Sequence, residues 1–216
     1  MPKDIVSGDF YWFGEENNKR IIAAIDCTGH GVPGAFMSMV GNAFLNEIVH
    51  EKEITTPALI LYELRTRVIH SLKQEGNYLD NKDRMDIAIC VFDKDLTNLE
   101  FAGANNPLWL IRGRELRQIN ADKQPIGSSG KELKDFTNHK VQLEKNDIIY
   151  IFTDGFPDQF GGEKGKKFNY KPLQELLKNH SDKPMLEVEK VLVGKFHEWK
   201  GDLQQVDDVC IIGIRV

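Results

Sequence analysis

Four aspartates in this chain lie where strand-like apolar runs end or are interrupted: Asp9, Asp26, Asp154 and Asp207. Carboxylates that a fold brings together repel one another unless a cation lies between them. Oxygen ligands without thiolate or imidazole favour a hard divalent ion such as Mg²⁺ or Mn²⁺ over Zn²⁺. If these four side chains meet at one end of a sheet, they would outline a two-metal site that can activate water.

The spacing of Asp9 and Asp26 predicts that they face each other across a hairpin. Two runs rich in aromatic and aliphatic residues, 5–14 and 20–27, flank a polar turn and are typical of paired strands. Asn17 and Asn18 suit a two-residue turn because Asn tolerates positive φ, and in that register Asp9 is opposite Asp26. Their Cβ atoms would then lie roughly 4.5–5.5 Å apart on one face. A longer turn or a bulge would break this register.

The second pair depends on strand polarity. Asp154 follows the apolar run 148–153, and Asp207 precedes the last apolar run, 209–216. If these strands are antiparallel neighbours, the end of one meets the start of the other. Taken singly, each aspartate also has a structural explanation, since Asp154 lies in a turn pattern and Asp26 can cap a helix. The functional interpretation therefore depends on the four occurring together.

Two amphipathic helices are predicted after the first hairpin. Residues 33–50 carry apolar residues at helical spacing, and Pro33 suits the first helical turn. Residues 56–74 form a second stripe behind Thr56, which is placed to cap the helix, and Gly76 is expected to end it. The predicted buried stripes are Phe36, Val40, Phe44 and Ile48 in the first helix and Leu61, Leu64, Val68 and Leu72 in the second.

Short apolar runs separated by turn signals predict six further strands, at 86–92, 99–104, 108–111, 115–119, 141–143 and 148–153. Helices at 171–179 and 184–199 and a strand at 209–216 complete the chain. Segregated runs of strands and helices favour an antiparallel α+β fold, with two sheets packed face to face and helices outside. With 216 residues, 41% of them hydrophobic, residues 1–216 are expected to form a single globular domain.

Composition argues against several functional classes. A formal net charge of −5 disfavours a nucleic-acid binder, which needs a broad basic face. No apolar run approaches the roughly 20 residues that span a bilayer, so we expect a soluble, cytoplasmic domain. Cys27, Cys90 and Cys210 lack C-x-x-C spacing, so each is expected to be a core residue rather than part of a disulfide or zinc site. Trp12 and Trp199 are likewise expected in the core.

Five segments resemble, in the same order, the stage II sporulation protein E branch of the metal-dependent (PPM-type) serine/threonine protein phosphatases. They are VSGDFYW (6–12), DCTGHGVPGAFMSM (26–39), FAGANNPLWLI (101–111), FTDGFPDQFGG (152–162) and QVDDVCIIGI (205–214). The resemblance implies a four-layer αββα sandwich that holds two Mn²⁺ or Mg²⁺ ions at one end. It also implies hydrolysis of phosphoserine or phosphothreonine by a metal-activated water.

The resemblance assigns roles residue by residue. The family's aspartate ligands of the two metals match Asp9, Asp26, Asp154 and Asp207. The backbone carbonyl of Cys27 matches a further ligand, and Asp158 matches a ligand of a weaker third metal.

Some positions depart from that pattern or have an open role. Eukaryotic relatives carry an arginine five residues before the first metal aspartate, where this chain has Asp4, so phosphate docking must depend more on the metals or on another cation. His30 lies beside the expected cluster and suits either a general acid or a loop residue. The turns Asn105-Asn106-Pro107 and 124–127 are expected to be structural, at the rim of the site.

The resemblance also implies partners. The substrate would be a phosphorylated regulatory protein such as an anti-sigma-factor antagonist, and relatives commonly carry this domain at the C-terminus of a sensor protein, some of them membrane-anchored. Because MPKDIVSGD leads into the first strand almost at once, we expect residues 1–216 to be the excised effector domain of a larger protein. An upstream domain or a homodimer partner is expected to act through the helices 33–50 and 56–74.

Two rival functions stay open. A catalytically weak module that binds a phosphoprotein or transmits a signal could keep this fold, although retention of all four aspartates speaks against it. A metal-dependent phosphodiesterase or nuclease is disfavoured by the acidic charge. A cysteine phosphatase is disfavoured because Cys27 is followed by Thr28-Gly29-His30-Gly31, without an arginine.

Overall fold

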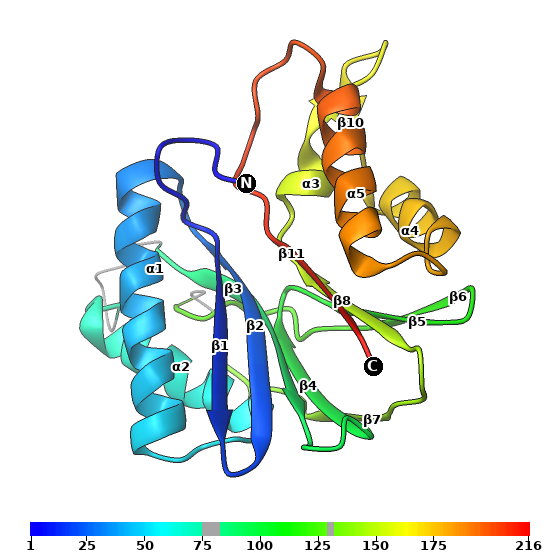
Figure 1. Cartoon of the computed structure of the whole chain (residues 1–216). Coiled ribbons are helices and arrows are strands. Elements are labelled where there is room, and N and C mark those ends of the chain that lie inside the picture. Colours follow the sequence, from blue (N-terminus) through cyan, green and yellow to red (C-terminus); the bar gives the residue numbers. More distant parts are fainter. Residues whose placement is uncertain (75–82, 129–131) are drawn as a thin grey trace.

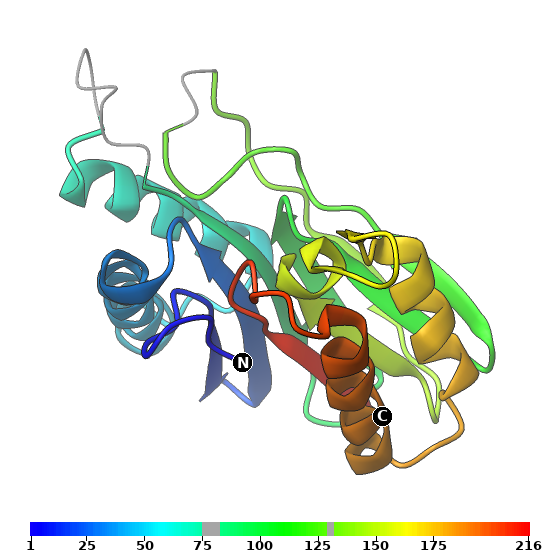
Figure 2. The same ribbon diagram turned by 90° about the horizontal axis from the view of Figure 1, so that it is seen from above.

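The computed structural model describes residues 1–74, 83–128 and 132–216, and the expected helix end at Gly76 lies outside these ranges. Two antiparallel sheets pack against each other, with helices on the outer side of each (Figures 1 and 2). The predicted α+β, four-layer αββα sandwich is confirmed.

The first sheet has the strand order β1-β2-β3-β4-β7, and the second has the order β11-β8-β5-β6. The strands of the first are β1 (Phe10–Glu16), β2 (Lys19–Cys27), β3 (Met85–Phe92), β4 (Asn98–Ala104) and β7 (His139–Gln142). Those of the second are β5 (Leu108–Arg112), β6 (Glu115–Ile119), β8 (Ile148–Phe152) and β11 (Ile211–Arg215). The helices are α1 (Gly31–Asn46), α2 (Pro57–Ser71), α3 (Gly155–Asp158), α4 (Tyr170–Asn179) and α5 (Met185–Lys200).

The first hairpin has the predicted register. Asn17 and Asn18 both have positive φ, 52° and 59°, and β1 pairs with β2 from Glu16↔Lys19 to Phe10↔Ile25. The next pair in this register is Asp9 with Asp26, at the end where β1 begins and β2 ends. Two asparagines in the left-handed region make a tight turn whose twist matches the strands, so the local sequence determines the pairing.

Three apolar layers hold the sandwich together. One lies between the first sheet and helices α1 and α2, one lies between the two sheets, and one lies between the second sheet and helices α3, α4 and α5. The buried face of α5 carries Val188, Leu192 and Phe196. Trp12 is buried in the first layer, which confirms it as a core residue, whereas Trp199 is only partly buried and packs at the edge of the third layer.

The predicted stripe of the first helix is wrong at Phe36 but not at its far end, where Ile48 is buried and Phe44 packs against the core. The buried positions of α1 are Gly34, Met37, Gly41 and Leu45, whereas Phe36 is 64% exposed. Gly34 and Gly41 let the helix approach the sheet closely: a Cβ on Gly41 would come within 3.1 Å of the Phe10 and Met85 side chains. The glycines therefore determine which side of α1 faces inward, which a count of apolar side chains does not detect.

The ends of these helices also differ in detail from the prediction. Helix α1 continues into a π-helical turn, η1 (Glu47–Glu51), before α2 begins. Thr56 is the N-cap residue of α2, as predicted, and Leu61, Leu64 and Val68 are buried.

Other boundaries differ from the expected ones. The first nine residues are not a strand, because the backbone N–H groups of Lys3 and Gly8 each donate to the Asp208 carboxylate at 2.7 Å and bend the segment toward β11. The pattern after Asp154 forms α3 rather than a simple turn, and the small strands β9 (Phe160–Gly161) and β10 (Lys166–Lys167) form a two-stranded ribbon.

Candidate functional site

A polar pocket of about 160 Å³ lies where strands from both sheets end. Its lining comes from the end of β2, the start of β3, the end of β8 and the segment before β11. The lining residues are Asp26, Cys27, Thr28, Gly29, Arg84, Asp86, Asp154 and Asp207. Three of the four predicted aspartates therefore share this pocket, although residues 26, 154 and 207 are far apart in the chain.

Asp9, the fourth predicted aspartate, lies beside the pocket in the hairpin register that places it opposite Asp26. It is 8% exposed, and its Oδ2 atom is buried with no hydrogen-bond partner among the described residues. Burial raises the pKa of Asp9 to about 7, against a hydrogen bond from Thr153, and the carboxylates of Asp208 and Asp207 raise it further. A buried carboxylate oxygen without a partner is costly, so this atom suits a cation ligand.

Asp26 is the most strongly perturbed carboxyl group of the pocket. Burial raises its pKa to about 9, and the neighbouring charges of Asp9, Asp154 and Asp86 act in the same direction. Without a cation, the folded protein therefore favours a protonated Asp26 at neutral pH.

Asp154 and Asp207 meet because β8 and β11 are antiparallel neighbours, as the sequence predicts. Burial, followed by the charges of Asp158 and Asp207, raises the pKa of Asp154 to about 6. The adjacent Asp208 has a different role, because its two oxygens accept the backbone N–H groups of Lys3 and Gly8. Asp208 thus fastens the N-terminal segment beside the pocket, while Asp207 is left to line it.

Asp86 is a pocket carboxylate that the sequence analysis missed. It pairs directly with Asp26 across β2 and β3, and its Oδ1 accepts a hydrogen bond from Asn105 Nδ2 at 2.8 Å. Burial raises its pKa, while the bond from Asn105 and the charge of Arg84 lower it. The only local signal was a carboxylate at the head of a predicted strand. The rim turn at Asn105 thus holds a pocket residue in place.

Cys27 and Asp158 lie at the edges of this site. Cys27 is buried, and burial together with the charges of Asp26 and Asp9 raises the pKa of its thiol well above the usual range, so the thiol stays protonated. Asp158 is outside the pocket lining and accepts a salt bridge from Lys167 Nζ at 2.6 Å. A role for Asp158 as a ligand of a third metal would therefore require that salt bridge to open.

His30 and Asp4 form an exposed pair next to the pocket. His30 Nδ1 lies 2.6 Å from Asp4 Oδ2, and His30 is the N-cap residue of α1. The pair joins the N-terminal segment to the loop that follows Asp26. His30 does not line the pocket, so its position favours a loop role.

The chemistry of the donors fits a hard divalent cation. Four aspartates line the pocket and a fifth lies beside it, with an unpartnered oxygen on Asp9 and raised pKa values at Asp9, Asp26 and Asp154. The described lining residues include no imidazole, and their one thiol is protonated, which disfavours zinc. In residues 1–74, 83–128 and 132–216, however, no three His, Cys, Asp or Glu side chains already form a ligand cluster. Metal binding would therefore require these carboxylates to adjust their positions.

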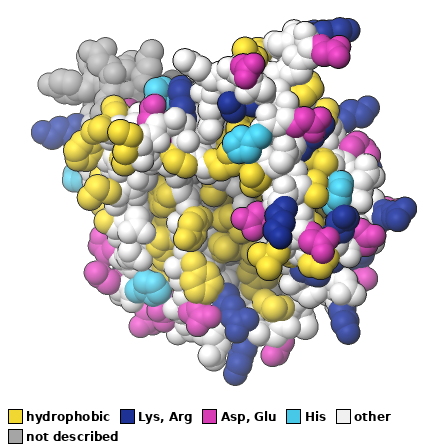
Figure 3. Space-filling view, turned by 45° about the horizontal axis from the view of Figure 1, so that its top comes forward, with side chains coloured by type: hydrophobic (Ala, Val, Ile, Leu, Met, Phe, Trp, Pro, Cys, Tyr) yellow, Lys and Arg dark blue, Asp and Glu magenta, His cyan; other side chains and the backbone are white. Residues whose placement is uncertain are grey.

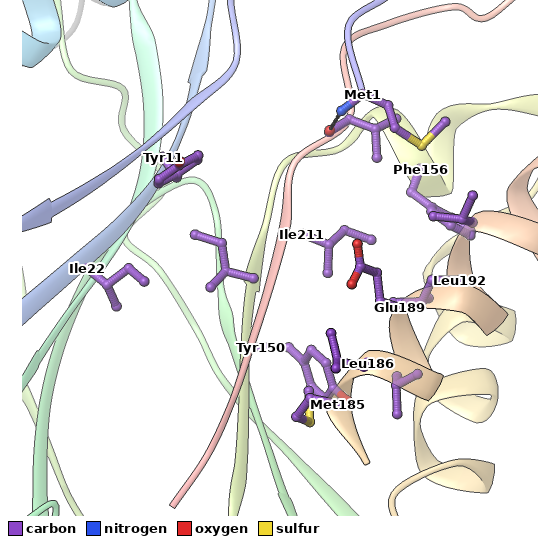
Figure 4. Close-up of a pocket in the computed structure, with 15 residues that line it drawn as sticks. Met1, Tyr11, Ile22, Tyr150, Phe156, Met185, Leu186, Glu189, Leu192 and Ile211 are labelled. Atoms are coloured by element: carbon purple, nitrogen blue, oxygen red, sulfur yellow. Dashed lines mark hydrogen bonds between the residues drawn. The ribbon is translucent and has the colours of Figure 1, made fainter. Parts of the chain in front are cut away.

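A larger cavity of about 540 Å³ lies elsewhere and has a different character (Figure 4). Tyr11 and Ile22 of the first sheet lie on one side, and Met185, Leu186 and Leu192 of α5 lie on the other (Figure 4). Glu189 is the one carboxylate among its described lining residues. An apolar cavity with one carboxylate cannot hold two cations, so the smaller polar pocket is the candidate site.

On the face shown in Figure 3, Lys and Arg are scattered among Asp and Glu rather than gathered in one broad area. Within the described residues, no helix is both long and apolar enough to cross a membrane.

Comparison with known proteins identifies relatives along nearly the whole chain. The family model of stage II sporulation protein E (SpoIIE) matches residues 17–216. The solved SiaA-PP2C domain of Pseudomonas aeruginosa is 32% identical, with a TM-score of 0.90, and the match covers 100% of this chain and 83% of that one. The solved PP2C phosphatase domain of SpoIIE from Bacillus subtilis, with a fragment of its regulatory domain, has the same fold. Its TM-score is 0.76 at 20% identity, over 99% of this chain and 59% of that one.

A curated relative adds a named activity. The phosphoserine phosphatase RsbP of Bacillus subtilis (strain 168) is 24% identical over 219 residues, which cover 98% of this chain and 49% of RsbP. This chain therefore spans about half the length of that relative.

Proposed function

Because the chain belongs to the stage II sporulation protein E family and has the fold of PP2C phosphatase domains, we propose that it hydrolyses phosphoserine or phosphothreonine on a regulatory protein with the help of divalent cations. The observation that carries the proposal is the convergence of Asp26, Asp86, Asp154 and Asp207 on one pocket, next to a buried Asp9 oxygen that lacks a partner among the described residues.

The residues that would hold two Mn²⁺ or Mg²⁺ ions are Asp9, Asp26, Asp154 and Asp207, together with the backbone carbonyl of Cys27. Asp158 would contribute to a weaker third site after releasing Lys167. Bound at this position, such ions lower the pKa of a coordinated water and neutralise phosphoryl oxygens.

The protein contributes to the reaction by positioning its own side chains. Asn105 donates to Asp86, so this carboxylate is oriented before any ligand enters. The Cys27 thiol is protonated and buried, so it does not serve as a nucleophile. Water is then the nucleophile that these residues support, and no covalent phosphoenzyme is needed.

The relatives suggest the partners that we propose. The RsbU and RsbW domains of a Mycobacterium tuberculosis protein and a protein of the bacterial stressosome are among the solved structures with this fold. We infer that the substrate is a phosphorylated regulatory protein, such as an anti-sigma-factor antagonist. We also infer that residues 1–216 act as a single effector domain under the control of an upstream sensor.

A catalytically weak signalling module is the second candidate. It is favoured by one observation, namely that no three of the described acidic, imidazole or thiol side chains already form a ligand cluster. Such a module would bind a phosphoprotein without turning it over.

The two functions are separated by titrating Mn²⁺ against phosphate release from a phosphoserine peptide. The proposed function predicts turnover that rises with Mn²⁺ and is lost in EDTA. Asp95→Asn is the matched control, since Asp95 is exposed in the turn between β3 and β4, and it should behave like the wild type. Full activity in EDTA would exclude the metal-dependent mechanism, and peptide binding without turnover at saturating Mn²⁺ would support the signalling module.

A further inference from the structure

Arg84 is a charged residue of the pocket that the carboxylate chemistry does not use. It immediately precedes β3 and lines the pocket together with Asp26, Asp86 and Asp154. Asp207 lines the same pocket, so three of the lining carboxylates, Asp26, Asp154 and Asp207, are ones that the proposed function assigns to cation binding. Arg84 is also the one cationic residue among the described side chains that line the pocket.

The backbone of Arg84 is fixed to the loop after β2. The Arg84 carbonyl accepts hydrogen bonds from the backbone N–H of Thr28 at 2.9 Å and from Thr28 Oγ1 at 3.0 Å, and the Arg84 N–H lies 3.3 Å from Thr28 Oγ1. These contacts hold the root of the side chain at the pocket wall. The side chain starts from a rigid position, so little ordering is needed for it to meet a ligand.

The guanidinium of Arg84 has unused donors. In the described part of the chain, no residue accepts a hydrogen bond or forms an ion pair with it, and the residue is exposed. Lys167, whose charge acts on Asp154, is already paired with Asp158. Position 4, where eukaryotic relatives carry an arginine, is occupied by Asp4, which is paired with His30. Arg84 is therefore the cation beside the carboxylates that is left to receive an anion.

We propose that Arg84 binds the phosphate group of the substrate at the mouth of the carboxylate pocket. This proposal rests on the proposed function, because it places a phosphate monoester beside the cation-binding aspartates. A guanidinium presents five N–H donors in a planar fork that matches two phosphate oxygens at once. Arg84 would hold and orient two phosphoryl oxygens at this place and so fix the position of the phosphate beside the carboxylates.

The test compares Arg84→Gln and Arg84→Lys with the wild type, and Arg114→Gln serves as the matched control. Arg114 lies in the exposed turn between β5 and β6, outside the pocket lining, so its loss removes the same charge from a remote place. At saturating Mn²⁺, Arg84→Gln should raise KM for the phosphopeptide and the inhibition constant of inorganic phosphate about 10- to 100-fold. Arg84→Lys should recover part of this loss, and Arg114→Gln should leave both constants at the wild-type values.

Calorimetry makes the test independent of turnover. Inorganic phosphate is titrated into the Mn²⁺-loaded protein, and Mn²⁺ is titrated into the metal-free protein. Arg84→Gln should weaken phosphate binding by the same factor of about 10- to 100-fold. It should not weaken Mn²⁺ binding, because the substitution removes a positive charge and so cannot increase the repulsion of the cation.

The outcomes separate the two proposals. If the wild type binds phosphate but does not hydrolyse the peptide, the proposed function fails and the phosphate titration still decides the role of Arg84. If Arg84→Gln changes the Mn²⁺ affinity or the melting temperature but leaves KM and phosphate binding unchanged, Arg84 only balances the charge of the aspartates and the inference is overturned. Unchanged values in all measurements would overturn it as well.

Discussion

The pocket carboxylates are chemically unequal, and burial is the main cause. In the metal-free protein the pKa values are about 9 for Asp26, about 7 for Asp9 and about 6 for Asp154. Asp208 is buried as well, but its oxygens accept backbone N–H groups. The buried and half-buried aspartates thus divide into one that fastens the chain and others whose charge is left without a partner.

Neutralising one pocket aspartate should reduce turnover while leaving the metal-free fold intact. Asp26→Asn and Asp154→Asn are each expected to lower turnover by at least about 100-fold, because each removes a proposed metal ligand. Loss of a residue that only hydrogen-bonds to a metal ligand already costs roughly 10- to 100-fold in metal affinity or activity. Thermal stability without metal should stay equal or rise, since one repelling carboxylate is gone. Phosphopeptide assays and thermal melts in EDTA measure the two effects, and unchanged turnover in either variant would remove that residue from the ligand set.

Cys27→Ser should keep most of the activity, because only the backbone carbonyl of residue 27 is implicated in the site. The thiol is buried beside carboxylates, so it is protonated and unsuited to attack phosphorus. Turnover at saturating Mn²⁺ and the melting temperature are the two measurements. A folded Cys27→Ser protein without activity would contradict the water mechanism and favour a cysteine nucleophile.

At the scale of elements, glycines determine how α1 approaches the site. A Cβ on Gly34 would come within 2.3 Å of the Gly29 carbonyl oxygen and 2.8 Å of the Gly8 Cα atom. Helix α1, the loop after β2 and the N-terminal segment therefore meet at this position. The backbone of the pocket loop depends on a helix that carries none of the pocket side chains.

Gly34→Ala is consequently expected to destabilise the protein by about 1–3 kcal/mol, because backbone atoms must move to admit the methyl group. Gly194→Ala is the matched control. Gly194 is exposed inside α5, and a methyl group there would have no described atom within 4 Å, so alanine should stabilise the helix by about 0.5–1 kcal/mol. Denaturant unfolding measures both changes. A Gly34→Ala protein as stable as the Gly194→Ala protein would show that the three segments do not pack as described.

Local patterns in the sequence predicted the elements and part of the site. The Asp9 and Asp26 pair follows from a two-residue asparagine turn, so the information lies within one short hairpin. Asp86 is opposite Asp26 in the structure, but β2 and β3 are separated by two helices, and no local rule gives the register of strands that distant. The inward side of α1 was missed for a related reason, since glycine carries no apolar side chain to count.

At the scale of the whole molecule, the acidic pocket makes stability depend on pH. A carboxyl group whose pKa is raised by folding binds its proton more tightly in the folded state than in the unfolded one. Its stabilising contribution is complete below the unfolded value near 4 and is lost as pH rises through the folded value. For Asp154, Asp9 and Asp26 this window extends from about pH 4 to about pH 9.

The metal-free protein should therefore melt at a lower temperature at pH 9 than at pH 6, and Mn²⁺ or Mg²⁺ should recover much of the loss. The Asp26→Asn variant removes the group with the highest pKa, so its melting temperature should fall less over the same range. Thermal melts in EDTA at several pH values, with and without added metal, measure this. A melting temperature that rises from pH 6 to pH 9 in EDTA would contradict the charge state assigned to the pocket.

Control by a partner concerns the outer face of α1, which nothing covers in the described residues. Val32, Phe36 and Met39 are 63%, 64% and 68% exposed and lie at helical spacing on this side. Leu59 and Tyr62 of α2 are also exposed. The opposite side of α1 touches the pocket loop through Gly34, so a partner bound outside could change the loop inside. The alternative is that both helices simply cover the sheet.

Forced dimerisation through an N-terminal coiled coil decides between these possibilities. If the pocket is complete only in a minor population of the isolated domain, the apparent metal affinity is reduced by that fraction, and a partner that stabilises the complete state restores it. The dimer is then expected to bind Mn²⁺ more tightly and to turn over faster than the monomer, and Phe36→Ser should abolish the gain while leaving the monomer unchanged, because Phe36 is exposed there. Identical metal dependence and turnover in monomer and dimer would refute control through α1.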